Sequence, residues 1–434
     1  MLAHHVAASV GRSSLSPLFY LAILITLILD MKKIMLFSAV FMTALSVNAG
    51  VFMNNDTTTN DTIKGFEFTD VKLVPTTSVK DQNKSGTCWC FAGTSFLEDE
   101  IVRQGGDSLD LSEMFTVRHC YDAKADRFVR NYGQVNFAQG GSLVDVLWAF
   151  KNFGAVPEEA YTGLNYGQDK HCHYELEGIL SGLLNTVVKK PDGKVSTAWR
   201  RAFDGVLDAY LGQLPAEFTY KGKKYTPKSF AASLPFKPED YVAVSSFTHH
   251  PFYEEFVLEV PDNWLSAPYK NVPLDELVAI IDNAIENGYP VNWAADVSEG
   301  GFKWKDGVAL LPKGKTEDDM TGTELSRWTT LSDKERQNEK YNFTAPVPEE
   351  EVTQESRQQM FDNQQTTDDH GMEIVGIAKD QNGSKYYKVK NSWDTNQKYH
   401  GFIYVSEPFL KAKTMGIVVH KNAIPKAIAK KIVK

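Results

Sequence analysis

The chain has 434 residues, of which 42% are hydrophobic and 12% aromatic, and this composition is typical of a globular protein rather than a disordered one. The net charge of -9 argues against broad attraction to nucleic acid or anionic membranes, because such binding needs clustered Lys and Arg. The four cysteines, Cys88, Cys90, Cys120 and Cys172, are too few for a disulfide framework and lack zinc-type spacing. One bridge between Cys120 and Cys172 is possible, and the sequence leaves it open.

The N-terminal region predicts export. From Met31 the chain reads "MKKIMLFSAVFMTALSVNAG", with two lysines, an apolar run over 34–47 and small residues before Ala49. These are the three parts of a secretory signal peptide, and the apolar run is too short for a membrane span. We expect residues 1–49 to be an extension plus signal peptide, with translation starting at Met31. The mature protein is expected to be periplasmic or extracellular, without a stable membrane anchor.

The next segments predict a linker followed by a helical region. Residues 50–65 are polar and rich in Asn, Thr and Asp, which is typical of a linker. Residues 66–164 contain three stretches with helical spacing of apolar side chains, at 88–104, 111–121 and 143–153. The first of these helices begins at Cys88 and is stopped by two glycines.

The last third predicts strands. Short runs rich in Val, Ile and aromatic residues are separated by Gly, Asn and Asp, and an Asn-Gly pair in "DQNGS" favours a hairpin. These runs are 288–297, 372–378, 385–393, 401–406 and 415–420. The chain is therefore expected to be α+β, with a helical half that carries the first two cysteines and a twisted antiparallel β half.

Cys88 and Cys90 differ in their expected environment. A helix N-terminus lowers the pKa of a thiol, which favours a reactive thiolate at Cys88. Cys90 is two residues further along and is rotated by about 200°, so it should face the core. An arbitrary cysteine is more often a buried apolar residue than a nucleophile. We keep that interpretation for Cys90 only.

A nucleophilic thiolate needs a base and a group that orients the base. His370 stands at the start of one expected strand, and Asn391 stands at the end of the next strand, 21 residues later. A hairpin of that length brings the two side chains together. His370 taken alone would more often be a structural histidine.

These motifs together resemble the papain-like cysteine peptidases. "SGTCWCFA" resembles the cysteine motif of that family, and "HGMEIVG" and "NSW" resemble its histidine and asparagine motifs. The resemblance implies a Cys88, His370 and Asn391 triad, with Gln82 as oxyanion donor and Trp393 shielding the asparagine. It also implies substrate contacts from a set of cleft residues. These are Trp89, Gly140 and Gly141 of "QGGSLVD", and Asn292 of "PVNWAADV".

The spacing resembles one branch of the family. Cys88 and His370 are separated by 282 residues, about twice the spacing of the papain branch, as in bleomycin hydrolase and aminopeptidase C. This resemblance implies a large helical insertion over 165–287, a β-rich catalytic half over 288–423 and a homohexamer. It also implies that a C-terminal arm, 424–434, lies in the cleft and makes the enzyme an aminopeptidase.

The implied reaction is hydrolysis of peptide substrates through a thioester, with no metal or organic cofactor. Two alternatives stay open. If the lysine-rich arm does not dock, the cleft is open and the protein would be an endopeptidase. A papain-like fold could also serve as a catalytically silent binding protein. One departure from the family pattern is Asp394, which stands where the family usually has Gly, and Asp tolerates such turns better than most residues.

Overall fold

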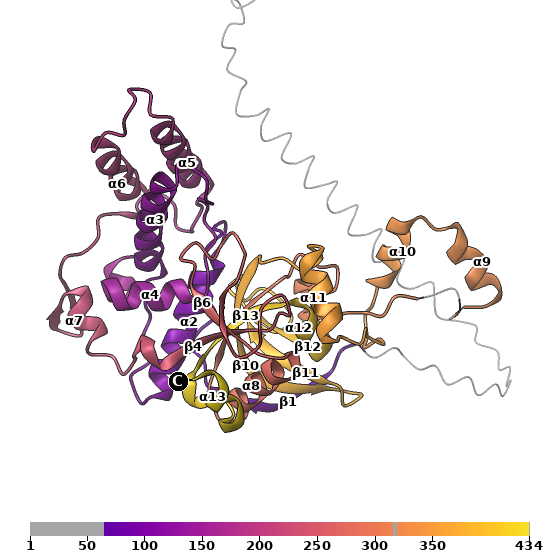
Figure 1. Cartoon of the computed structure of the whole chain (residues 1–434). Coiled ribbons are helices and arrows are strands. Elements are labelled where there is room, and N and C mark those ends of the chain that lie inside the picture. The colour runs from indigo at the N-terminus through magenta and orange to yellow at the C-terminus, as the bar shows by residue number, and fades with distance from the viewer. Residues whose placement is uncertain (1–64, 316–317, 319, 434) are drawn as a thin grey trace, which may run out of the picture. The chain divides into compact units, whose positions relative to one another are not determined.

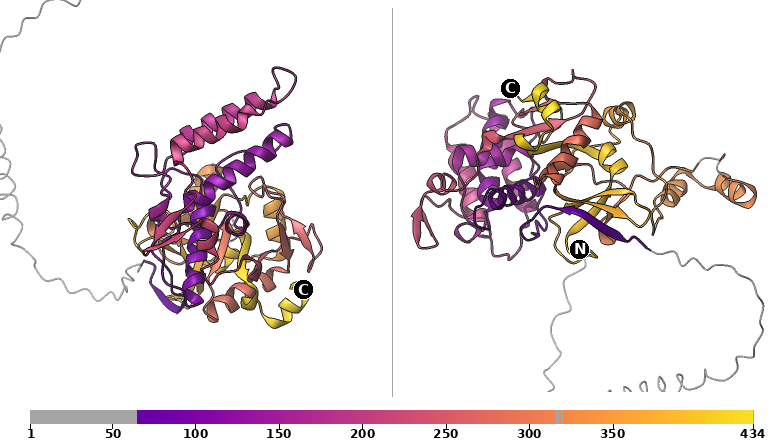
Figure 2. Two further views of the ribbon diagram at one scale, coloured as in Figure 1. Left: turned by 90° about the vertical axis from the view of Figure 1, so that its left-hand side faces the viewer. Right: turned by 90° about the horizontal axis from the view of Figure 1, so that it is seen from below.

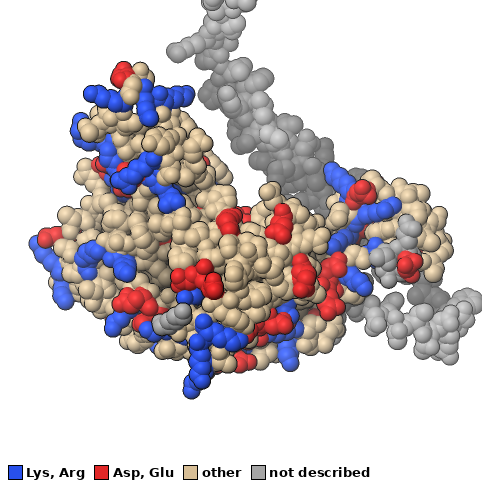
Figure 3. Space-filling model, in the orientation of Figure 1, with Lys and Arg blue, Asp and Glu red and all other residues tan. Residues whose placement is uncertain are grey.

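The computed structural model describes residues 65–433 except 316, 317 and 319. The predicted signal peptide and nearly all of the predicted linker lie outside the described residues. Within those residues, no helix combines the length and apolar character needed to cross a membrane. On the face shown in Figure 3, basic and acidic side chains lie in small separate groups.

The helical half contains the three predicted helices, α2 (Cys88–Arg103), α3 (Glu113–Arg130) and α4 (Val144–Phe153). Helix α3 continues well beyond its predicted end, and Ser112 caps its start by accepting a hydrogen bond from the Phe115 N–H. These helices share one apolar core with the two helices that follow, so α2 is buried along most of its length.

Helices α5 (Tyr174–Val188) and α6 (Ala198–Leu211) pack against each other and against α3, as Figures 1 and 2 show. Each helix buries a row of apolar side chains spaced four residues apart, which forms one stripe on a helix of 3.6 residues per turn. The buried rows are Leu176, Leu180 and Leu184 on α5, and Phe203, Leu207 and Leu211 on α6.

The β half is built on one sheet, and each of the five predicted β segments overlaps one of its strands. The strand order is β5-β6-β4-β13-β7-β10-β11-β12-β9-β8, and β1 also pairs with β10. Most neighbours are antiparallel, whereas β4 with β6 and β9 with β12 are parallel. The strands are β1 (Phe68–Leu73), β4 (Tyr241–Ser245), β5 (Glu255–Val257), β6 (Pro268–Asn271), β7 (Val291–Ala295), β8 (Phe302–Lys303), β9 (Val308–Ala309), β10 (His370–Asp380), β11 (Lys385–Lys390), β12 (Phe402–Ser406) and β13 (Thr414–His420).

The segment 165–287 contains the expected helices and also contributes to the sheet. After α5 and α6 it forms a hairpin of β2 (Phe218–Tyr220) and β3 (Lys223–Tyr225), and it then adds β4, β5 and β6 to one end of the main sheet. The insertion is thus anchored in both halves of the molecule. The remaining helices are α7 (Pro227–Ala231), α8 (Leu274–Glu286), α9 (Gly322–Thr330), α10 (Asp333–Lys340), α11 (Gln354–Asp362), α12 (Glu407–Lys413) and α13 (Lys426–Ile432).

The C-terminal segment does not lie in the cleft, which corrects the expectation drawn from the resemblance. Residues 426–432 form α13, and its Ile428 and Ile432 are buried in the core of the β half together with residues of α8. Lys431 pairs with Glu276 of α8 at 2.6 Å. The reason is that a lysine-rich helix with two apolar residues four positions apart buries one side and keeps its charges in solvent.

Candidate active site

Cys88 is the first residue of α2, as predicted, and the turn that precedes it is fixed by polar contacts. The hydroxyl groups of Ser85 and Thr87 lie 2.6 Å apart, and the Gly86 N–H donates to the Gln139 side chain at 2.6 Å. The Cys88 thiol is half-buried and lines a cavity between the helical and β halves, whereas the Cys90 side chain is fully buried, as expected.

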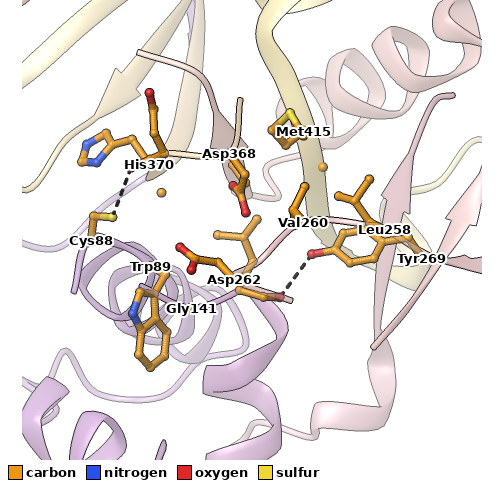
Figure 4. Close-up of a pocket in the computed structure, with 16 residues that line it drawn as sticks. Cys88, Trp89, Gly141, Leu258, Val260, Asp262, Tyr269, Asp368, His370 and Met415 are labelled. Atoms are coloured by element: carbon orange, nitrogen blue, oxygen red, sulfur yellow. Dashed lines mark hydrogen bonds between the residues drawn. The ribbon is translucent and has the colours of Figure 1, made fainter. Parts of the chain in front are cut away.

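The start of β10 comes close to this helix. A Cβ atom at Gly371 would lie 2.9 Å from Trp89 Cα and 3.3 Å from the Cys88 carbonyl oxygen, so only glycine permits the approach. His370 therefore lies beside Cys88 in the same cavity, as Figure 4 shows. The Cys88 sulfur is also 4.0 Å from the Asp369 carbonyl oxygen.

Asn391 lies where the end of β11 meets the start of β10. Its Oδ1 is 2.7 Å from His370 Nε2, and the Trp393 ring lies 4.5 Å from the imidazole, centroid to centroid. A carbonyl oxygen can only accept, so the shared proton is on Nε2 and Nδ1 is left as the basic nitrogen. Asp394 has a positive φ of 69°, and its carboxylate accepts the Thr395 N–H, which stabilises the turn as expected.

Gln82 is buried and its amide is held from both ends. Ser392 Oγ donates to Gln82 Oε1 at 2.7 Å, and Gln82 Nε2 donates to the Ser85 carbonyl at 2.7 Å. An amide nitrogen has two N–H groups, so one remains for a further acceptor. The Gln82 side chain is thereby fixed next to the turn that carries Cys88.

Comparisons with known proteins agree with this arrangement. Residues 65–197 match the papain family cysteine protease model, and residues 320–434 match the Peptidase C1-like family model. The chain thus carries papain-family regions at both ends of its described part and is a cysteine-type peptidase. It is 20% identical to Aminopeptidase C of Lactobacillus delbrueckii subsp. lactis over 82% of each chain. It is also 24% identical to Aminopeptidase C of Lactococcus lactis subsp. cremoris, over 80% of this chain and 81% of that protein.

A solved structure supports the fold. PepW from Lactobacillus rhamnosis superimposes with a TM-score of 0.62 at 18% identity, covering 84% of each chain. The papain-like α+β fold is therefore confirmed, and it includes the insertion because the match spans most of both chains. The peptidase and PepW share this fold in spite of their low sequence identity.

Burial controls the protonation of the Cys88 and His370 pair. It raises the pKa of the Cys88 thiol to about 12, although the backbone N–H groups of Gly371 and Trp89 oppose this shift. It also lowers the pKa of the His370 imidazole to about 4. Desolvation raises the Cys88 pKa more than the helix N-terminus lowers it through the Trp89 N–H, so the expected net lowering of the pKa is not found. A thiolate can form here when His370 takes the proton, since the two opposite charges then stabilise each other.

The predicted substrate residues divide into two groups. Trp89 and Gly141 line the cavity, and Trp89 Nε1 donates to the Gln139 carbonyl at 3.0 Å. Gly140 lies directly beneath Asp262, because a Cβ atom built on it would be only 2.0 Å from Asp262 Oδ2. The placement of Asn292 in the cleft is wrong: it is 1% exposed and its amide lies beside Gly93 of α2. Asn292 shares a face of β7 with the cavity residue Ala294 but is two residues deeper.

The sequence analysis missed one side of the cavity. Residues 258–262, which we call the cleft wall, follow β5 and contribute Leu258, Val260 and Asp262 to the lining. Asp368 also lines the cavity, two residues before His370. The "DDH" tripeptide was a visible signal for Asp368, whereas no local pattern connects 258–262 with a site more than 100 residues away in the sequence.

Proposed function

We propose that this cysteine peptidase is an aminopeptidase that works through a Cys88, His370 and Asn391 triad. Cys88 attacks the carbonyl carbon of the first peptide bond after its proton passes to His370 Nδ1. His370 then protonates the leaving amine, and water hydrolyses the thioester. The observation that carries the proposal is the 2.7 Å contact between His370 Nε2 and Asn391 Oδ1 beside Cys88. It leaves Nδ1 as the proton acceptor.

Gln82 is proposed as a donor to the oxyanion. Its amide is pre-positioned by Ser392 and Ser85, so little reorganisation is needed when negative charge develops on the substrate oxygen. The Cys88 backbone N–H, at the first position of α2, would be the second donor. The similarity to two proteins named Aminopeptidase C supports the choice of an aminopeptidase.

The proposal is tested by combining a substrate with an active-site label. Aminoacyl aminomethylcoumarins with a free amino group should be hydrolysed, and one equivalent of iodoacetamide should abolish the activity by alkylating Cys88, as located by peptide mass mapping. The buried Cys90 and Cys120 should stay unmodified in the folded protein. Hydrolysis that survives complete alkylation of Cys88 would contradict the proposal.

One observation favours the endopeptidase alternative. The segment 424–433 packs on α8 and does not line the cavity, so the arm that the resemblance implied is not what would restrict this cleft to N-terminal residues. If nothing else blocks the cleft, internal peptide bonds would be cleaved. Peptides with acetylated N-termini separate the two functions, because only an endopeptidase would cleave them.

Two further proposals concern the whole protein. We propose export through the signal sequence that ends at Ala49, for which N-terminal sequencing of the mature protein should give Gly50 as first residue. A protein that retains residues 31–49 would contradict it. We also propose a homohexamer, by similarity to the bleomycin hydrolase branch, and light scattering measures this mass directly.

A further inference from the structure

One part of the cleft would bind the substrate residues on the N-terminal side of the cleaved bond, and we call it the acyl side. It is nearly filled by the protein's own side chains. The cavity next to Cys88 has a free volume of about 20 Å³, which is room for about one water molecule. Leu258 and Val260 of the cleft wall occupy this space, together with Tyr269 of β6 and Met415 of β13. Figure 4 shows these side chains grouped on the side of the cavity away from the imidazole. A substrate that extends past Leu258 and Val260 would therefore have to displace these side chains.

Asp262 covers the backbone that a longer substrate would use. The glycine pair Gly140 and Gly141 is expected to line the path of the substrate chain, and the Asp262 carboxylate lies directly over Gly140. A peptide extending past the glycines would meet this carboxylate. The only hydrogen bond to it from another described residue is a long one, 3.4 Å, from Asn136 Nδ2.

The cleft wall is anchored, so it is a fixed part of the site. Glu259 accepts from His249 at 3.0 Å and from His250 at 2.6 Å, on the outer side of the wall. Asn263 Nδ2 donates to the Leu258 carbonyl at 3.1 Å, and Leu258 itself is buried. These contacts link the two ends of the segment to each other and to the residues before β5.

The acyl side of the cleft carries negative charge. The cavity is lined by Asp262, Asp368 and Asp369, and no Lys or Arg is among its lining residues. Asp369 is committed to the backbone N–H groups of Val297 and Ser298, whereas no described residue donates a hydrogen bond to the Asp368 carboxylate. Lys124, whose positive charge acts on Asp262, donates its hydrogen bonds to the carbonyl oxygens of Ala138 and Gly140. Figure 4 shows Asp262 and Asp368 in the same part of the cavity, between Cys88 and the apolar side chains of Leu258 and Met415.

We infer that the cleft wall limits the acyl side of the site to one residue, and that the carboxylates of Asp262 and Asp368 bind the α-ammonium group of the substrate. This inference rests on the proposed peptidase function and gives it a structural cause. The carbonyl oxygen of Asp369, 4.0 Å from the Cys88 sulfur, offers a third acceptor for the same ammonium group. Charge-assisted hydrogen bonds of this kind are about twice as strong as neutral ones.

The first test compares substrates on the intact enzyme. Alanyl aminomethylcoumarin should be hydrolysed at least about a hundredfold faster than its N-acetyl form, and acetyl-dialanyl aminomethylcoumarin should be a similarly poor substrate. Equal rates for the free and acetylated forms would overturn the inference and leave the peptidase function intact. Failure to hydrolyse any of the three would overturn the proposed function and this inference together.

The second test removes the charge without changing the shape. D262N should lower kcat/KM for the free-amine substrate by about ten- to a hundredfold and leave the rate for the acetylated substrate unchanged. D107N is the matched control, because Asp107 is an exposed aspartate far from the cavity lining, and it should change neither rate. Iodoacetamide labelling of Cys88 verifies that each variant is folded. An unchanged ratio of the two rates in unlabelled D262N, when a separate sample of the variant still reacts with iodoacetamide at Cys88, would overturn the assignment.

The third test opens the wall. The double variant V260G/D262G should gain hydrolysis of acetyl-dialanyl aminomethylcoumarin by about tenfold or more, because the removed side chains make room for a second residue. If the unlabelled variant still rejects this substrate, although it hydrolyses alanyl aminomethylcoumarin and a separate sample reacts with iodoacetamide at Cys88, the wall is not the block and the inference fails.

Discussion

The C-terminal segment and the cleft wall are two short segments that differ in charge and in their distance from the cavity. The C-terminal helix α13 carries lysines, buries Ile428 and Ile432 against the β half and leaves the cleft alone. The cleft wall carries Asp262, comes from the insertion and lines the cavity beside Cys88. A cationic segment in the cleft would repel the α-ammonium group of a substrate, whereas an acidic one attracts it. If the cleft wall restricts the site as we propose, this role depends on the position and charge of a segment and not on its being the end of the chain.

The largest expected effect comes from removing the nucleophile in the cavity that the cleft wall lines. C88A should lower kcat/KM by at least about 10⁴-fold, because it removes the nucleophile. C90S is the matched control, since the Cys90 thiol is fully buried and donates to the Glu113 carbonyl, where a hydroxyl can do the same. Most of the activity should remain in C90S. The reverse result in a fluorogenic assay would exclude Cys88 as nucleophile.

The next effect concerns Gln82, which lies next to the turn that carries Cys88. Q82A should lower kcat by about 10²–10³-fold with little change in KM, because an oxyanion donor acts where charge develops in the transition state. Steady-state kinetics on one free-amine substrate separates the two parameters. A change confined to KM would mean that Gln82 binds substrate and does not stabilise the oxyanion.

A smaller effect is expected from pH. Burial, together with the negative charges of Asp262, Asp369 and Asp145, raises the pKa of Asp368 to about 7. The carboxylate is therefore neutral below that pH, and kcat/KM for free-amine substrates should rise about tenfold as the pH increases from 6 to 8. His370, with a pKa of about 4, is already neutral over this range and does not contribute.

The variant D368N checks the origin of this pH dependence. It should flatten the rise between pH 6 and 8 for free-amine substrates, because the titrating carboxylate is gone. N-acetylated substrates, measured on the intact enzyme, should show no rise at all. A rise that persists in D368N would assign the titration to another group and argue against binding of the ammonium group by Asp368.

The smallest effect on activity is expected from the C-terminal helix. I432A should lower the free energy of unfolding by about 2–5 kcal/mol, because Ile432 is almost fully buried, yet the preference for a free amino group should not change. K431A is the control: it breaks a partly exposed pair with Glu276, which should change the free energy of unfolding much less than I432A does. Denaturant unfolding and the two substrates measure both quantities. If I432A loses the preference for a free amino group, the C-terminal segment determines this preference.

The sequence predicted much of the fold, because its signals are local. Apolar spacing located α2, α3 and α4, and alternating runs located β7 and β10 to β13. The Cys, His and Asn motifs could be found for the same reason: each lies at the end of one element, and the papain-like pattern gives their order. The structure brings Cys88 and His370 into one cavity, as the resemblance implied.

The rest depends on contacts between distant segments. Residues 258–262 reach the site only because β4, β5 and β6 join the sheet beside β13, and no local pattern indicates that pairing. Asn292 was misplaced because strand periodicity gives the face of a side chain but not its depth. The pKa of Cys88 was misjudged because a helix terminus is a local feature, whereas burial is a property of the whole fold.

The most direct measurement is the product profile of a ten-residue peptide, supplied with a free or an acetylated N-terminus and followed by mass spectrometry. The intact enzyme and a variant lacking residues 424–434 should both remove single N-terminal residues in sequence and leave the acetylated peptide whole. V260G/D262G should cleave the acetylated peptide. If the tail-deleted variant cleaves the acetylated peptide and the wall-opened variant does not, the tail rather than the cleft wall closes the site, and the account is contradicted.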